Sequence, residues 1–194
     1  MQLKQWVLGI ICLGLMISCA RIPPQEEQLE LAKTYNDQIL QYDQQGQFKK
    51  ALSLAEEAFK IRTEILGEKH RLTLTSLNNL ASIYQSLGHL KEALPLYEKG
   101  YRLRTEVLGA KHPDTLTSLN NLASIYQALG RLKEALPLFE KGYRLRTEVL
   151  GAKHPDTLTS LNNLAFIYQA LGSLEKALPL FEKGYRLRSK VLGW

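Results

Sequence analysis

Apolar side chains recur along most of this chain with the spacing of amphipathic helices. In the segment 115–129 they fall every three or four residues, which places them on one face of an α-helix. These residues are Leu116, Leu119, Leu122, Ala123, Tyr126 and Leu129. Gly130 follows the segment, and glycine often ends a helix because it readily takes positive φ. The pattern predicts one helix that stops at this glycine.

A second amphipathic segment follows at 132–150 and ends before Gly151. Its predicted buried side chains are those of Ala135, Leu136, Phe139, Tyr143 and Val149. Pro137 lies near the start of this segment, where few backbone hydrogen bonds are lost, so we expect a mild bend rather than a break. Asp114, which follows Pro113, is the predicted N-cap of the first helix because its carboxylate can accept from unpaired N–H groups. The two segments together predict a helical hairpin.

This hairpin is a repeated unit. The segment 105–146 is preceded by a close copy at 63–104 and followed by another at 147–188, each offset by 42 residues. Neither helix of a unit can bury its apolar face alone, so the units must stack on one another. Self-similarity at one fixed period therefore predicts an all-α fold, an α-solenoid of tandem hairpins.

The units at the two ends differ from the central ones. Residues 29–62 read as a diverged hairpin in which Gln38 stands where the next copy has Leu80, as expected of an N-terminal cap that faces water. The last unit, 147–194, continues for only six residues beyond Arg188 and shows no polar capping helix. We expect an uncapped apolar C-terminal end, which either packs on a second copy or a partner, or marks a truncated array.

The unit contains the string LGAKHPDTLTSLNNLASIYQALGRLKEALPLFEKG, with small residues where the two helices are expected to cross. This string resembles the long tetratricopeptide repeats of kinesin light chains and their prokaryotic relatives. The resemblance extends from about Leu29 to the C-terminus. It implies a right-handed superhelix in which the first helix of each hairpin lines a concave groove that holds peptide segments.

Polar residues on the predicted first helices match the groove positions of that family. The candidate peptide-binding residues are Asn36, Asn78, Asn79, Asn120, Asn121, Asn162, Asn163, Gln85, Gln127 and Gln169. A side-chain amide both donates and accepts, so it can hold an extended backbone without demanding a sequence. Phe166, which replaces Ser82 and Ser124 of the earlier copies, is a candidate apolar anchor on the groove wall. Alternatively, the asparagines cap turns or bond between neighbouring helices and bind nothing.

No set of residues with catalytic spacing occurs in the chain. No pair of carboxylates, no Ser/His/Asp set and no phosphate-binding loop has plausible spacing. His70, His112 and His154 recur once per unit, a repeat apart, and so cannot converge on one metal ion. The simpler interpretation is that each histidine packs or caps within its loop. We predict a protein that is not an enzyme and that has no metal or cofactor.

The net charge of +6 adds little to this picture. Lys141, Arg144 and Arg146 are expected on the second helix, facing the convex side, where they could attract a membrane surface weakly. Glutamates are interspersed with them, and no interleaving of aromatic residues suited to base stacking appears. We predict no nucleic-acid partner.

The first residues have a different character. Residues 1–19 begin with a short positive region and an apolar run that is too short to span a bilayer, as in a signal peptide. The run ends in LMISC, which resembles the bacterial lipoprotein box and would make Cys19 the lipidated residue. Ala20 after it would then imply the outer membrane of a Gram-negative cell. An ordinary signal peptide, giving a secreted or periplasmic protein, and an uncleaved anchor are the alternatives. Residues 20–28 read as a short tether.

These features together predict a non-catalytic interaction scaffold. It would bind an extended segment of a partner protein in its groove and be held at a bacterial envelope by a lipid anchor. The alternatives are a structural protein that self-assembles into a homo-oligomer through its C-terminal end, and a cytoplasmic cargo adaptor like the kinesin light chains.

Overall fold

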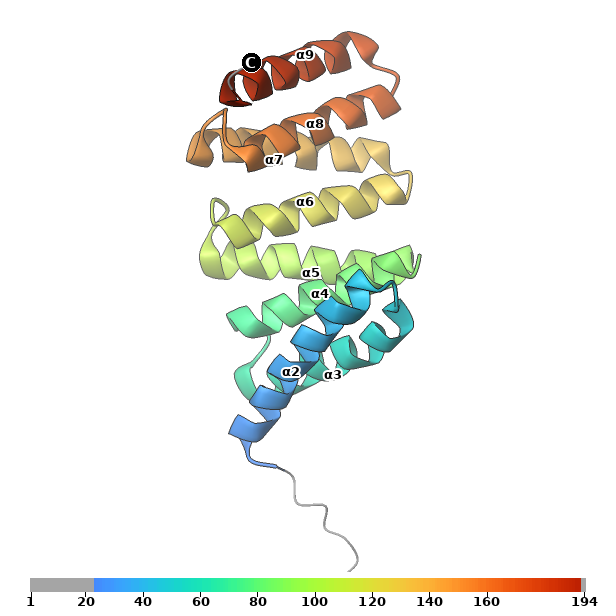
Figure 1. The fold of residues 1–194 in the computed structure, drawn as a ribbon, viewed down its shortest axis with the longest axis vertical. Coiled ribbons are helices and arrows are strands. Elements are labelled where there is room, and N and C mark those ends of the chain that lie inside the picture. The colour runs from blue at the N-terminus through green and yellow to red at the C-terminus, as the bar shows by residue number, and fades with distance from the viewer. Residues whose placement is uncertain (1–22, 193–194) are drawn as a thin grey trace, which may run out of the picture.

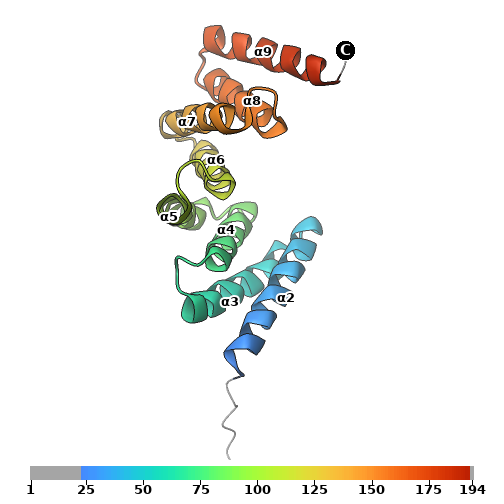
Figure 2. The same cartoon turned by 90° about the vertical axis from the view of Figure 1, so that its left-hand side faces the viewer.

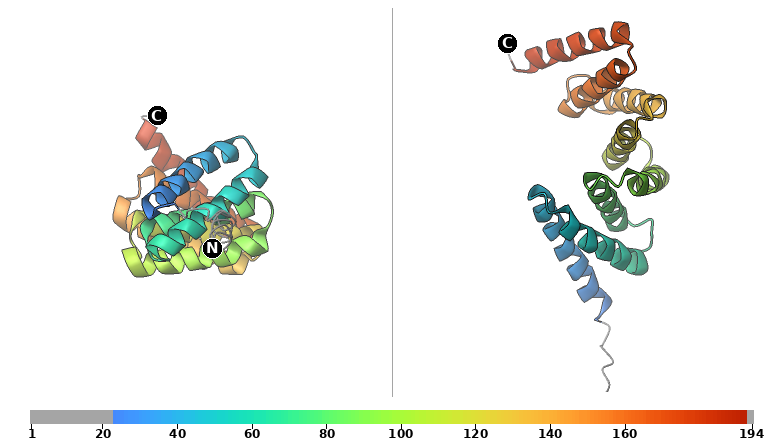
Figure 3. Two further views of the ribbon diagram at one scale, coloured as in Figure 1. Left: turned by 90° about the horizontal axis from the view of Figure 1, so that it is seen from below. Right: turned by 90° about the vertical axis from the view of Figure 1, so that its right-hand side faces the viewer.

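The computed structural model describes residues 23–192, which fold into eight α-helices. They are α2 (Gln25–Gln44), α3 (Phe48–Leu66), α4 (Arg71–Ser86), α5 (Leu90–Leu108), α6 (Pro113–Ala128), α7 (Leu132–Leu150), α8 (Pro155–Ala170) and α9 (Leu174–Leu192). Consecutive helices pair into hairpins that stack along one long axis, so α2 and α9 lie at opposite ends (Figure 1; Figure 3). The predicted all-α solenoid is confirmed.

The stack is curved, with α4, α6 and α8 along its inner side and α5 and α7 along its outer side (Figure 2). Packing is almost entirely between helices adjacent in sequence. Between hairpins, a typical core cluster joins Ala81 and Ala93 to Tyr97, Leu122 and Ile125. Both alanines are fully buried, and their small side chains let the two helices of the hairpin approach closely. This cluster recurs in the next hairpin, so one packing solution serves each repeat.

The sharp turn after each second helix depends on glycine. Gly109 follows α5 with φ 85° and ψ 159°, and Gly151 follows α7 with nearly the same angles. Side chains with a Cβ are strongly disfavoured in this region of backbone space. The predicted helix 132–150 and its end at Gly151 are therefore confirmed, and Pro137 does not interrupt α7.

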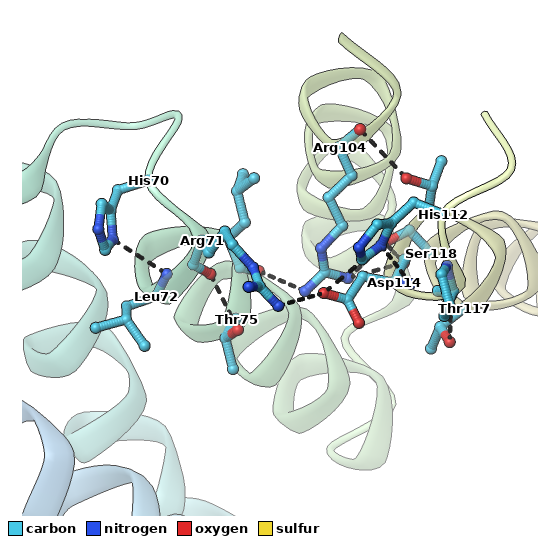
Figure 4. A network of polar contacts seen from close by, with 12 residues as sticks. His70, Arg71, Leu72, Thr75, Arg104, His112, Asp114, Thr117 and Ser118 are labelled. Atoms are coloured by element: carbon cyan, nitrogen blue, oxygen red, sulfur yellow. Dashed lines mark hydrogen bonds and ion pairs between the residues drawn. The ribbon is translucent and has the colours of Figure 1, made fainter. Parts of the chain in front are cut away.

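The start of each first helix differs from the prediction. His112 precedes α6, and its Nδ1 accepts a hydrogen bond from the backbone N–H of Asp114 at 3.1 Å (Figure 4). His112, and not Asp114, is therefore the N-cap. The helix begins at Pro113 because proline has no N–H to lose in the first turn. His70 and His154 cap α4 and α8 in the same way, which confirms the capping interpretation of the repeated histidines.

Two further predictions are wrong, one about the burial of Val149 and one about the tether. Val149, predicted to be buried, is 43% exposed because it lines an open pocket between α6 and α8. Residues 25–28, predicted as tether, form the first turn of α2, where Glu26 and Glu27 interact favourably with the helix dipole. Residues 20–22 of that tether lie outside the described residues.

One predicted member of the outer basic stripe has a structural role instead. Arg146 donates to Ser160 Oγ at 2.7 Å and to the Leu116 carbonyl at 3.0 Å, so it ties α7 to α8 and α6. Arg104 makes the same contacts one unit earlier and is buried. Burial lowers the pKa of the Arg104 guanidinium. These arginines therefore connect neighbouring repeats through hydrogen bonds and do not belong to a solvent-facing patch.

Candidate functional site

The predicted asparagines come together in one row along the first helices. Asn121 Nδ2 on α6 donates to Asn78 Oδ1 on α4 at 2.9 Å, and Asn163 on α8 donates to Asn120 on α6 at the same distance. The row continues toward the N-terminus, where the Asn36 amide on α2 lies 3.3 Å from Asn79 and its oxygen accepts from the Arg62 guanidinium. These seven residues are called the asparagine row below: Asn36, Asn78, Asn79, Asn120, Asn121, Asn162 and Asn163.

The pairs Asn121–Asn78 and Asn163–Asn120 bond between neighbouring helices, and their amides keep further hydrogen-bonding capacity. The Asn162 oxygen instead accepts from the Arg188 guanidinium of the same hairpin. Each asparagine side chain has two donor hydrogens and two acceptor positions. The contact between Asn121 and Asn78 uses one donor hydrogen of the first and one acceptor position of the second. All members are only half-buried, so water or a ligand reaches them. The pairing thus orients the paired amides and leaves some of their donor hydrogens and acceptor positions unused.

A hollow of about 530 Å³ adjoins the row between α6 and α8. Its lining residues are Gln127, Asn163, Phe166, Gln169 and Ala170. Phe166 is 53% exposed, as expected of a groove residue and not of a core residue. Its ring contacts that of Phe181 on α9 edge to face, with 5.1 Å between centroids. Sequence reasoning missed Phe181, because its position in the repeat belongs to the buried stripe.

The three glutamines do not share one environment. Gln127 and Gln169 line the hollow, whereas Gln85 Oε1 accepts from the Tyr97 hydroxyl at 2.9 Å. Tyr97 is buried, and burial raises its pKa to about 12. In the next two copies phenylalanine stands at the Tyr97 position, so only Gln85 has this phenol partner. Gln85 is therefore partly committed to packing within its own hairpin.

Tyrosines on the first helices form a second repeated contact. The hydroxyls of Tyr84, Tyr126 and Tyr168 each donate to a glutamate on the preceding second helix, and Tyr168 bonds Glu140 Oε1 at 2.5 Å. This bond raises the pKa of Tyr168 to about 12, because the phenol proton is held by a carboxylate. These phenols stay protonated near neutral pH and serve to join hairpins.

The remaining sequence predictions concern metals, membranes and the C-terminal face. Among residues 23–192, no three His, Cys, Asp or Glu side chains gather closely enough to hold a metal ion. None of the described helices is long and apolar enough to cross a membrane. The predicted leader 1–19 and its Cys19 lie outside the described residues. On α9, Leu174, Leu178 and Tyr185 are 62%, 61% and 77% exposed, and homo-oligomer formation through this end stays a prediction.

A family model described as tetratricopeptide repeat matches residues 30–106, 92–148 and 114–190. The overlapping matches extend over most of the chain and coincide with the stacked hairpins. The chain belongs to the tetratricopeptide repeat family. Tetratricopeptide repeats form a scaffold fold typical of protein–protein interaction, and the resemblance inferred from the repeated string is thereby confirmed at the level of the family.

Solved tetratricopeptide structures resemble this one over nearly its full length. The crystal structure of "kinesin light chain nearly identical TPR-like repeats" from Podosopora anserina is 30% identical, with 96% of this chain and 84% of that chain covered and a TM-score of 0.70. BtubC (BKLC) from P. vanneervenii is 24% identical, with 90% and 68% covered and a TM-score of 0.79. A Rap protein complexed with competence and sporulation factor is 18% identical, with 85% and 43% covered and a TM-score of 0.68. The last two share the fold alone, and no curated protein matches the chain.

Proposed function

We propose that this tetratricopeptide repeat protein is a non-catalytic scaffold that binds an extended segment of a partner protein along the asparagine row. The observation that supports this most is the row itself, in which amides from α4, α6 and α8 are oriented by one another and remain half-exposed. The complex of a Rap protein with competence and sporulation factor is consistent with a ligand-binding role for this fold.

The chemistry of the row fits a peptide backbone. Alternating donors and acceptors can pair with backbone N–H and C=O groups, which are present in every peptide, so the row itself demands no particular sequence. Specificity would come from the hollow beside Phe166, which can receive an apolar side chain. The proposed ligand is an extended segment with one apolar residue placed to reach this ring.

The row can be tested with peptides selected from a random library on the full-length chain. Replacing Asn78, Asn120 and Asn162 together with alanine should weaken the selected peptides at least about tenfold, because each lost hydrogen bond contributes ~0.5–1.5 kcal/mol. Dissociation constants measured by fluorescence polarisation report the change. The matched control is Lys60, Arg102 and Arg144 to alanine, three exposed residues at equivalent positions of the second helices.

Phe166→Ser extends this experiment, because it restores the residue of the two preceding copies. It should weaken only those peptides that carry an apolar anchor residue. Unchanged affinity in the triple asparagine variant, with the fold intact by circular dichroism, would contradict binding along the row. An equal loss of affinity in the control triple variant would show that the effect is not specific to the asparagine row.

Attachment to a bacterial envelope through Cys19 is the second part of the proposal, and it is supported by the LMISC string at residues 15–19. Acyl chains on one cysteine would hold the protein firmly, at roughly 0.8 kcal/mol per buried CH₂. Radioactive palmitate should label the wild type and not Cys19→Ala when both are produced in a bacterial cell. Label in neither protein would return the leader to a plain signal peptide or anchor, and the groove proposal would stand unchanged.

A further inference from the structure

A small pocket opens between α6, α7 and the start of α8, away from the asparagine row. Its volume is about 260 Å³. Leu116 and Val149 supply apolar wall, and Asp156 supplies a carboxylate at the first turn of α8. Pro113 and Arg146 also line it. Apolar wall with one carboxylate is the environment that suits a long cationic side chain, which has an apolar stem and a charged head.

The preceding repeat shows which residue pairs with the equivalent carboxylate. Each residue named above has a counterpart 42 positions earlier, and these are identical except that Arg71 stands in place of Pro113. Arg71 Nη2 lies 3.6 Å from Asp114 Oδ2, as the close view shows (Figure 4). An arginine of the chain itself therefore pairs with the carboxylate in one repeat, and in the next a proline without a charged group stands in its place.

The exposure of the two carboxylates reflects this difference. The Asp114 side chain is 46% exposed beneath Arg71, whereas the Asp156 side chain, which faces Pro113, is 68% exposed. The Asp156 carboxylate also lies near the capping histidine His154, whose Nδ1 is 3.9 Å from Oδ2.

Arg146 does not block a second cation at this pocket. Its guanidinium is already committed to Ser160 Oγ and to the Leu116 carbonyl. The preceding repeat again provides the comparison, because Arg104 makes the same two contacts while Arg71 pairs with Asp114 beside it. Two guanidinium groups are therefore accommodated around one carboxylate in this fold.

We propose that the pocket beside Pro113 binds the guanidinium group of an arginine side chain from a partner protein. The aliphatic stem lies against Leu116 and Val149, and the guanidinium pairs with Asp156 as Arg71 pairs with Asp114. Exposed ion pairs are weak, so this is one contact within a larger interface, with a dissociation constant for an isolated arginine on the order of 1 mM or weaker.

The test uses N-acetyl-arginine methylamide as probe and its neutral isostere, N-acetyl-citrulline methylamide, as control. Titration of the full-length ¹⁵N-labelled chain should give saturable shifts of the amide signals of His154 and Asp156 with the arginine probe only. Asp156→Asn should abolish saturation. Equal shifts with citrulline, or no change in Asp156→Asn, would overturn the proposal.

The repeats themselves supply a reciprocal pair of variants whose folds have precedent in the chain. Pro113→Arg copies the preceding repeat into the pocket and should abolish binding of the probe. Arg71→Pro copies the following repeat and should create a second site, seen as new saturable shifts of the His112 and Asp114 amides. Binding that survives Pro113→Arg, or no new site in Arg71→Pro, would contradict the assignment. The probe needs no peptide in the groove, so this result is independent of the proposed function.

Discussion

Leu119→Ala is expected to lower the free energy of unfolding by about 2–5 kcal/mol, the range measured when a buried leucine is truncated. Leu119 on α6 is fully buried and packs with Leu116 and Leu145, so the substitution removes transfer energy and leaves a cavity. The cavity cannot close easily, because Ala123 and Ala135 already hold α6 and α7 in close contact. Urea unfolding followed by circular dichroism measures the loss.

The matched control for Leu119 is Leu72→Ala, the same change on α4 at a side chain that is 47% exposed. It should cost less than about 1 kcal/mol, because little apolar surface returns to water and no cavity forms. A solenoid can also unfold by parts, so the slope of the urea transition should be compared between variants. Similar losses for the two leucines would contradict the packing described for α6.

Arg104→Ala is expected to destabilise the chain by about 2 kcal/mol through loss of contacts between repeats. Its guanidinium donates to Ser118 Oγ at 2.5 Å and to the Leu74 carbonyl at 3.2 Å, which ties α5 to both α6 and α4. Hydrogen bonds from a charged donor contribute ~1.5–3 kcal/mol each. Desolvation opposes this gain, as the lowered pKa of the Arg104 guanidinium indicates, so the net effect is smaller than the sum.

Two further substitutions separate the charge from the stem of Arg104. Arg102→Ala removes an exposed arginine two residues away and should change stability by less than about 0.5 kcal/mol. Arg104→Met keeps most of the apolar stem and loses the hydrogen bonds. If Arg104→Met is as stable as the wild type, desolvation cancels the bonds and the arginine contributes only packing. Thermal or urea unfolding distinguishes these cases.

Several polar details of the repeat could not be predicted from the sequence. Asp114 was predicted as the N-cap because aspartate is a common cap. In the structure the helix already begins at Pro113, and the ring nitrogen of His112 accepts from the backbone N–H of Asp114. Arg146 was expected on the convex side with Lys141 and Arg144, but it is half-buried, and its counterpart Arg104 is buried. Their burial depends on where the next hairpin places Ser118 and Ser160, which is a matter of stacking and not of local pattern.

The candidate site, too, was predicted only in part from the sequence. Periodicity together with the family resemblance placed the asparagines on the first helices, and Phe166 emerged because it breaks the repeat. The pairing of Asn121 with Asn78, and not with Asn79, depends on the relative height of α4 and α6 in the stack. The pocket beside Pro113 also required the structure, since Pro113 and Asp156 are remote in sequence and meet only when hairpins stack.

The helical hairpin, its repetition and the likeness to the family could be predicted from the sequence, because apolar periodicity and glycine turns are local properties that every copy repeats. Which polar side chains bond, which are buried and which line open surface became visible only once the hairpins were stacked. These outcomes depend on the register between successive hairpins, set by the packing of small and apolar residues where helices cross. Because the copies are nearly identical and stack in the same way, the few positions at which they differ, such as Phe166 and Arg71, stand out as candidates for function.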